Sequence, residues 1–231
     1  MWILLLTTLW ANSLTEVPEA AWTPLFEEEG IDVSVYLPEG RELPVFRAKG
    51  IFTENLYEIL AVLDDVPRHI DWMVRMAESR EVEKAGDLDR VLYNRFDVPW
   101  PVSDRDSVIR VQAIFNQTSQ EVNVAFTRVV HAGMPELDGV VRIPMMESLA
   151  KLRFLGEKKT EVTYIIDIDP GGSIPMWLVK WIIKRIPLKL LRQLKQQIED
   201  TRGQYTEFIS RYRPGGAPAV KTEAMPVLVS D

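Results

Sequence analysis

The chain has 231 residues, of which 46% are hydrophobic and 26% are charged, a composition that suffices for a hydrophobic core and differs from that of disordered chains. Its net charge of −7 argues against nucleic acid as a partner, because phosphate contacts need clustered Lys and Arg. The sequence contains no cysteine, which excludes disulfides, thiolate nucleophiles and cysteine-based metal sites.

Residues 1–13 form a short apolar run that ends in small or polar residues. The run from Trp2 to Trp10 is shorter than the about 20 apolar residues that a transmembrane helix needs. It is typical of a secretory signal peptide with cleavage near Ser13, although no Lys or Arg precedes it. An N-terminal helix of the folded protein is the alternative. We expect a periplasmic or secreted protein if the segment is a signal, and a cytoplasmic one otherwise.

The next part of the chain alternates between helical and extended patterns. Residues 22–29 are interpreted as a short helix, and residues 31–52 as two strands joined by a turn at residues 38–40. Thr53 is the expected N-cap of a helix, and Pro67 is expected to separate it from a second short helix over residues 69–76. The apolar residues of the first helix that recur at helical spacing are Leu56, Leu60 and Leu63.

From residue 81 to residue 169 the apolar pattern has a period of two. Such strands bury one face and expose the other, as in an antiparallel sheet, and the short turns between them favour a meander. The apolar positions that alternate with polar ones are Ile109, Val111, Ala113, Phe115, Val122, Val124, Phe126, Val162, Tyr164, Ile166 and Ile168.

A helical pattern returns after Asp169. Gly171 and Gly172 permit a sharp exit from the last strand, Ser173 and Pro175 suit a helix start, and Pro187 is expected to kink or break the helix. Residues 213–231 are rich in Pro, Gly and Ala, which indicates a disordered tail. No repeat or linker divides the chain. A curved antiparallel sheet that wraps around one long C-terminal helix is the simplest α+β arrangement of these elements.

Two sequence strings, in this order, resemble the StAR-related lipid-transfer (START) domain, particularly its bacterial members. They are PWPVSDRD before a strand and DPGGSIPMWLVKW at the start of the last helix. The resemblance covers residues 22–202. It implies a helix-grip fold, also called START/Bet v 1-like, with an internal hydrophobic tunnel that holds one lipid or sterol-like ligand. In that family, the loop that matches residues 98–103 and the C-terminal helix form the gate of the tunnel.

The resemblance also suggests which side chains form the tunnel and its gate. Trp100 stands between Pro99 and Pro101, so a rigid apolar ring is expected to line or cap the entrance; the alternative is that the ring packs the loop onto the body. Methionines add apolar surface that adapts to ligands of varied shape. The residues expected in the tunnel and gate are Trp72, Met73, Trp100, Val111, Phe115, Phe126, Met146, Tyr164, Trp177 and Trp181.

Arg105 and Asp106 open the strand that follows the first string. Because they are adjacent, they point to opposite faces, and both cannot lie in the tunnel. The pattern favours a structural pair that fixes the loop, since a buried charge needs a fixed partner; a polar contact to a lipid headgroup is the alternative. Some lipid-binding members carry a charged residue further along this strand. Ile109 and Val111 occupy that face here, which implies a more apolar lumen.

The last helix is basic, although the protein is acidic. Residues 177–202 hold seven Lys or Arg against two acids, a local charge of +5, which leaves about −12 for the remainder of the −7 chain. Such a helix suits transient contact with anionic lipid headgroups, and we expect Lys180, Lys184 and Arg185 to face the membrane. A helix that packs one face on the sheet and keeps a solvated basic face is the alternative.

These observations favour a monomeric, non-enzymatic lipid carrier that needs no cofactor or metal. One alternative is an enzyme of the cyclase or hydrolase type on the same scaffold. His69 and His131 are the two histidines available as bases, and neither has an identifiable nucleophile beside it in the sequence. Another alternative is a lipid sensor that acts through a protein partner.

Overall fold

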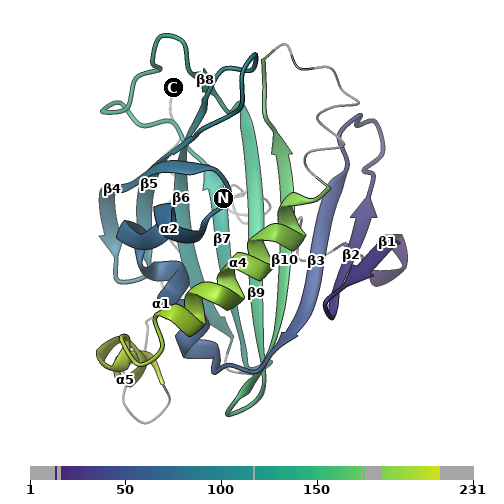
Figure 1. Ribbon diagram of the computed structural model, residues 1–231, viewed down its shortest axis with the longest axis vertical. Coiled ribbons are helices and arrows are strands. Elements are labelled where there is room, and N and C mark those ends of the chain that lie inside the picture. Colours follow the sequence, from purple (N-terminus) through teal and green to yellow (C-terminus); the bar gives the residue numbers. More distant parts are fainter. Residues whose placement is uncertain (1–13, 15–16, 117, 173, 175–183, 214–231) are drawn as a thin grey trace, which may run out of the picture.

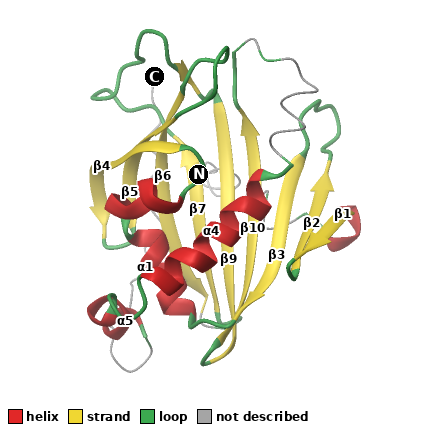
Figure 2. Cartoon of the chain, viewed as in Figure 1, coloured by secondary structure: helices red, strands yellow, loops and turns green. Residues whose placement is uncertain are grey.

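The computed structural model describes residues 14, 17–116, 118–172, 174 and 184–213, and a ten-stranded sheet forms its main layer (Figures 1 and 2). Helices cover one face of that sheet, as the α+β prediction requires. The strands are β1 (Thr23–Glu28), β2 (Ile31–Tyr36), β3 (Val45–Phe52), β4 (Met76–Gly86), β5 (Asp89–Phe96), β6 (Arg105–Asn116), β7 (Glu121–Arg128), β8 (Val141–Arg142), β9 (Met145–Gly156) and β10 (Lys159–Asp169).

The sheet consists of two antiparallel meanders joined side by side. The spatial order is β1-β2-β3-β10-β9-β7-β6-β5-β4, so the last long strand, β10, pairs with β3. This antiparallel pairing runs from Thr160 opposite Phe52 to Ile166 opposite Phe46. The two-residue strand β8 pairs with β6 in parallel. The meander that the sequence predicts is therefore present, and the β3–β10 contact makes it one continuous curved sheet.

The helices lie on the inner, concave face of the sheet. They are α1 (Leu56–Asp64), η2 (Val66–Arg68), α2 (His69–Trp72), α4 (Ile186–Asp200) and α5 (Thr206–Tyr212). The short helix η1 (Glu19–Ala21) precedes β1 and lies on the other face. Helix α4 crosses the sheet diagonally (Figure 2). Pro187 lies in its first turn, where proline is tolerated, rather than within its body. Its apolar stripe is buried against the sheet and consists of Leu188, Leu191, Leu194 and Ile198.

The main core lies between the concave face and the helices. The alternating apolar residues that the sequence predicts on β6, β7 and β10 all belong to this core or pack against it. The same core receives Leu56, Leu60 and Leu63 from α1. This single cluster explains why the chain forms two layers: the sheet and the helices each bury one apolar face against the other.

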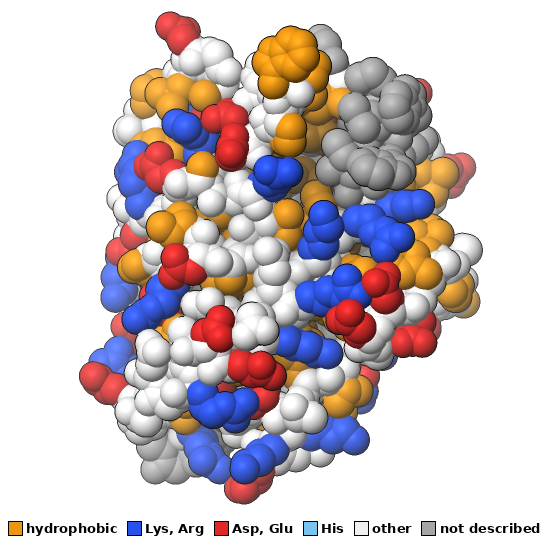
Figure 3. Space-filling view, viewed as in Figure 1, with side chains coloured by type: hydrophobic (Ala, Val, Ile, Leu, Met, Phe, Trp, Pro, Cys, Tyr) orange, Lys and Arg blue, Asp and Glu red, His pale blue; other side chains and the backbone are white. Residues whose placement is uncertain are grey.

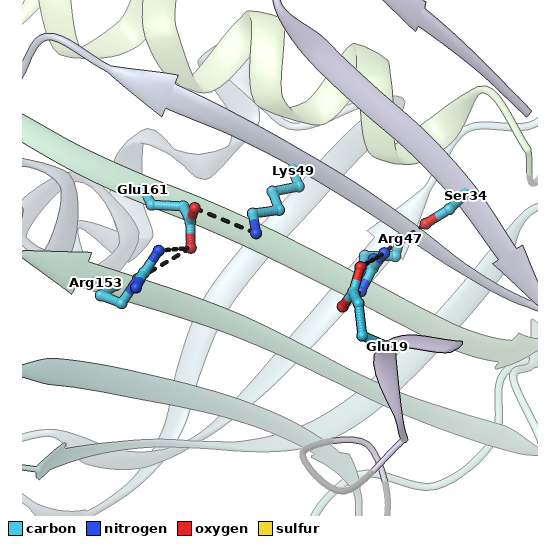
Figure 4. Close-up of polar contacts among 6 residues, drawn as sticks. All are labelled: Glu19, Ser34, Arg47, Lys49, Arg153 and Glu161. Carbon is cyan, nitrogen blue, oxygen red and sulfur yellow. Dashed lines mark hydrogen bonds and ion pairs between the residues drawn. The ribbon is translucent and has the colours of Figure 1, made fainter. Parts of the chain in front are cut away.

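The outer, convex face carries a smaller core and a set of ion pairs. Trp22 packs beside Tyr36 on a cluster that contains Val45, Leu149 and Ile165. Figure 4 shows polar side chains of this face: Arg47 binds Glu19, with Nη1 2.6 Å from Oε2, and Glu161 accepts from Lys49 at 3.2 Å and Arg153 at 2.9 Å. The segment before β1 is thus fixed across the outside of the sheet.

One predicted element type and two predicted boundaries are wrong: the helix predicted over residues 22–29 is a strand. Residues 23–28 form a strand because a Glu29–Gly30 turn with positive φ at both residues (56° and 71°) folds them into a hairpin with β2. The N-cap of α1 is Asn55, whose side chain accepts a hydrogen bond from Tyr57 N at 2.9 Å, rather than Thr53. Helix α2 ends at Trp72, since β4 already begins at Met76.

Several predictions lie outside the described residues. They concern the signal peptide at residues 1–13, the tail beyond Arg213, and Ser173, Pro175, Trp177, Lys180 and Trp181 at the start of the last helix. Gly171 and Gly172 are described, and both have positive φ (65° and 72°), as a sharp exit from β10 requires.

Candidate ligand-binding site

The concave face brings most of the predicted tunnel residues together. Phe126 and Tyr164 meet in an edge-to-face contact with ring centroids 6.4 Å apart. Burial raises the pKa of Tyr164 to about 12, so its hydroxyl stays protonated in this apolar environment. The predicted residues that belong to or pack against the main core are Trp72, Met73, Val111, Phe115, Phe126, Met146 and Tyr164.

One end of this apolar space is closed by α5, which the sequence did not predict. Phe115, near the end of β6, lies between Tyr57 of α1 and Tyr212 of α5, with centroid distances of 6.5 Å and 6.1 Å. Phe208 packs on Tyr212 at 4.7 Å, and the two are one helical turn apart. That spacing of two aromatic residues was the available signal for α5. Phe115 is therefore part of an aromatic plug at the end of the space.

A small cavity lies beside this plug. It has a volume of about 10 Å³, close to that of one water-sized sphere. Its lining combines apolar side chains with Asp64 and Arg90, which form an ion pair at 2.6 Å. The apolar lining residues are Leu60, Leu63, Leu88, Val111, Ala113 and Val124.

The loop over residues 97–104 lies at the opposite end of β6 from the aromatic plug. The two ends of this twelve-residue strand are roughly 36 Å apart, at a rise of about 3.3 Å per residue. Val98 N donates to Asp104 Oδ1 at 3.2 Å, and Arg95 pairs with the same carboxylate at 3.3 Å, so the base of the loop is fixed. Trp100 projects from it with 91% of its surface exposed. The ring therefore neither packs the loop onto the body nor lines the core, and that part of the prediction is wrong.

Asp106 and Arg105 leave β6 on opposite faces, as their adjacency predicts. On the outer face, Asp106 accepts two hydrogen bonds from Arg142, at 2.7 Å from Nε and 3.0 Å from Nη2. Both side chains are buried, to 1% and 9% exposure. Arg142 also donates to the carbonyls of Met134 and Pro135, which ties the loop between β7 and β8 to β6. Sequence reasoning did not find Arg142, which lies 36 residues from Asp106.

Arg105 lies on the inner face and binds carbonyl groups. Its Nη1 donates to Ser103 O in the 97–104 loop, and its Nη2 donates to Gly171 O at 3.3 Å after β10. One guanidinium thus joins the two chain segments that border this end of the concave face. Arg105 and Asp106 do not form a pair with each other.

The two histidines lie on different elements and differ in their surroundings. His69 is buried in α2, where Nε2 lies 3.1 Å from Leu63 O and Nδ1 lies 3.1 Å from Ser79 Oγ. Desolvation lowers the pKa of His69 to about 4, so the ring is neutral. His131, in the loop after β7, lies 3.4 Å from Glu83. His69 is thus a packed structural residue.

The described part of the chain offers no sign of a metal site or a membrane span. Its residues bring together no three His, Asp or Glu side chains that could hold a metal ion. Within the same residues, no helix is long and apolar enough to cross a membrane.

Basic side chains follow the line of α4 on the face shown in Figure 3. Two of them are engaged with the β1–β2 turn: Arg185 pairs with Glu28 at 3.1 Å, and Arg192 pairs with Glu28 at 2.5 Å and with Glu29 at 2.9 Å. Arg185 also lies over the ring of Phe26 at 4.8 Å. These contacts hold Arg185 against β1. Lys189 is exposed, and Lys184 is half-buried.

The comparisons with known proteins agree with this geometry. Residues 11–202 match the model of the START domain. An uncharacterised protein of Pseudomonas aeruginosa is 30% identical over 178 residues, which cover 77% of this chain and 87% of that protein. The phosphatidylcholine transfer protein of Bos taurus is 29% identical over 71% of this chain and 78% of its own length. A crystallised fragment of a StAR-related lipid transfer protein from Xanthomonas axonopodis superimposes with a TM-score of 0.71, at 30% identity, over 78% of this chain and 99% of the fragment.

The curved sheet, the helix laid across it and the apolar core between them define a helix-grip protein of the lipid-binding class. The chain belongs to the START domain family.

Proposed function

We propose that the protein carries one lipid in the space between the concave face and α4, and moves it between membranes. The main support for this proposal is the continuous apolar surface of the concave face, which is formed by side chains from β6, β7, β9, β10 and α2. Burial of acyl chains there contributes roughly 25 cal/mol per Å² of apolar surface removed from water. Such binding requires no catalytic residue. The relatives named as lipid transfer proteins support the same function.

The direct test is transfer of a labelled phospholipid from donor to acceptor vesicles. The protein should accelerate transfer in proportion to its concentration and take up one lipid per chain. A protein that binds one lipid but leaves the transfer rate unchanged would point to a lipid sensor instead.

The end of the fold near Trp100 is proposed as the gate and the membrane-contact surface. Three exposed apolar side chains come from the loops at this end: Trp100 at 91%, Val130 at 84% and Leu137 at 44% exposure. Pairing of β6 with β7 places the start of one beside the end of the other, and Val129 N donates to Val108 O at 2.9 Å. Apolar side chains gathered at one exposed end are typical of a surface that meets a membrane.

Replacement of Trp100 by alanine should reduce transfer without destabilising the fold. Because the ring is 91% exposed, we expect the free energy of unfolding to change by less than about 0.5 kcal/mol. Transfer should slow by about tenfold, since burial of a large apolar side chain in the membrane contributes roughly 1.5–3 kcal/mol. Leu155→Ala, a change at an apolar residue of the opposite end with 40% exposure, is the control for vesicle transfer. Equal rates for Trp100→Ala and the unaltered protein would remove this residue from the gate.

The basic side of α4 should govern the preference for anionic vesicles. Lys184→Gln combined with Lys189→Gln should slow transfer to anionic vesicles by several-fold at low salt, because each basic residue near such a surface contributes about 1 kcal/mol. Transfer to neutral vesicles should be unchanged, and added salt should abolish the difference. Arg185→Gln is expected to have a smaller effect, since Glu28 already pairs with it. An unchanged transfer rate to anionic vesicles for the double variant at low salt would show that this side of α4 does not contact the membrane.

A further inference from the structure

Arg105 is a buried cation, 5% exposed, that forms no ion pair with any of the described residues. The neighbouring Asp104 is engaged with Arg95 and with Val98 N. Residues 173–183, which follow Gly172, include no Asp or Glu in the sequence. Removal of a charged group from water is costly unless another charge or several hydrogen bonds compensate it.

Three other arginines with little exposed surface have carboxylate partners. Arg142 binds Asp106, Arg90 binds Asp64, and Arg47 binds Glu19. Arg105 has two backbone carbonyls instead, and its Nε has no hydrogen-bond partner among the described residues. The two carbonyls satisfy part of the guanidinium. Burial still lowers the pKa of Arg105, although the negative charge of Asp104 acts in the opposite direction.

The side chain of Arg105 lies on the face of β6 that lines the concave space. The same face carries Ile109 and Val111, which belong to or pack against the main core. Arg105 pairs in register with Phe96, which also packs on that core. A Cβ atom added at Gly172 would lie 3.2 Å from Arg105 Nη2, so the guanidinium is confined between β6 and the exit from β10.

A second unsatisfied polar group lies on the same face of the strand. Ser107, two residues further along β6, is fully buried, and its Oγ has no hydrogen-bond partner among the described residues. Side chains two residues apart on a strand are roughly 7 Å from each other along the same face. A buried hydroxyl left without a partner loses free energy that a bound polar ligand can restore.

We propose that Arg105 and Ser107 form an oxyanion site at the gate end of the concave space, which binds the phosphate diester or the carboxylate of an amphipathic lipid. This inference rests on the proposed carrier function and specifies its ligand: an amphiphile with an anionic oxygen rather than a neutral sterol or diacylglycerol. Guanidinium groups bind phosphate and carboxylate with paired, charge-assisted hydrogen bonds. The acyl chains then extend along the apolar face toward Phe115.

The first experiment compares ligands on the unaltered full-length chain. Lipid-free protein is incubated with vesicles that contain trace-labelled dioleoylphosphatidylcholine, oleate, dioleoylglycerol or cholesterol, and the label is measured in the protein fraction after the vesicles are pelleted. We expect phosphatidylcholine or oleate to exceed dioleoylglycerol by at least about tenfold, the size of one charge-assisted interaction. The comparison of phosphatidylcholine with oleate identifies phosphate or carboxylate as the bound group.

Equal capture of dioleoylglycerol or cholesterol would overturn the oxyanion site and leave the carrier function intact. Capture of none of the four lipids would overturn both proposals. The two failures are thus distinguishable in one assay.

Variants then test the residues themselves. Arg105→Gln should reduce capture of the anionic-oxygen lipid by about 10- to 100-fold and leave dioleoylglycerol capture unchanged. Arg153→Gln removes the same charge from the outer face of β9, where Arg153 pairs with Glu161 away from the 97–104 loop, and is the control. Because Arg105 also binds Ser103 O and Gly171 O, its replacement can affect folding, so Ser107→Ala provides a second test. That change should keep the melting temperature and lower capture of the same lipid several-fold. If the folded variants still prefer phosphatidylcholine or oleate over dioleoylglycerol as strongly as the unaltered protein does, Arg105 and Ser107 do not form the oxyanion site.

Discussion

Replacement of Asp106 by alanine is expected to lower the free energy of unfolding by about 3–5 kcal/mol, because it leaves the Arg142 guanidinium as an uncompensated buried charge. Asp106 is 1% and Arg142 is 9% exposed, and two hydrogen bonds join them. For a chain of this size, such a loss corresponds to a fall in melting temperature of roughly 6–20 °C. Thermal and urea unfolding measure it directly.

Two further variants separate the buried charge from the loss of contacts in general. Glu78→Ala removes an exposed partner of Arg80, in a pair with 42% and 48% exposed side chains, and should cost less than about 1 kcal/mol. The double change Asp106→Leu with Arg142→Met removes both charges and should recover most of the stability. A loss below about 1 kcal/mol for Asp106→Ala would contradict the claim that this buried pair holds the loop between β7 and β8 against β6.

Acid should destabilise the protein through His69. The folded-state pKa of this ring is about 4, against 6.5 for a free histidine, because burial disfavours the charged form. Above pH 6.5 the ring is neutral in both states and its contribution is constant. As the pH falls from 6.5 to 4 the unfolded chain binds a proton that the folded chain does not, so the free energy of unfolding decreases by up to about 3 kcal/mol.

The matched variants for this prediction are His69→Gln and His131→Gln. A glutamine amide can donate to Leu63 O as His69 Nε2 does, but it does not titrate. His69→Gln should therefore flatten the loss of stability between pH 6.5 and 4, measured by urea unfolding at each pH. His131→Gln changes the other histidine and should leave that loss in place. A wild-type slope that persists in His69→Gln would show that other groups cause it.

The fold followed from the sequence where the hydrophobic period was long and regular. The period of two in β6, β7 and β10 identified the concave face residue by residue, because alternate side chains of a strand share a face. The errors fell on short elements. Residues 23–28 lack a clear period, and the hairpin that makes them β1 depends on positive φ at Glu29, which a glutamate rarely adopts.

The candidate site was predictable in its apolar part and less so in its polar part. Periodicity alone placed Phe126 and Tyr164 on one face, where they are in contact. The ion pair of Asp106 and Arg142 depends on a loop that returns to β6 after 36 residues, and no local pattern encodes such a return. The exposure of Trp100 was missed because a tryptophan between prolines suits a packed ring as well as a projecting one.

The most direct test of the central claim is native mass spectrometry of the protein purified without detergent, followed by solvent extraction of the bound material. We predict one lipid per chain, in a one-to-one complex that dissociates on unfolding. A protein that is empty as purified, and that takes up no lipid from mixed vesicles, would contradict the claim that the space between the concave face and α4 is a lipid-binding site.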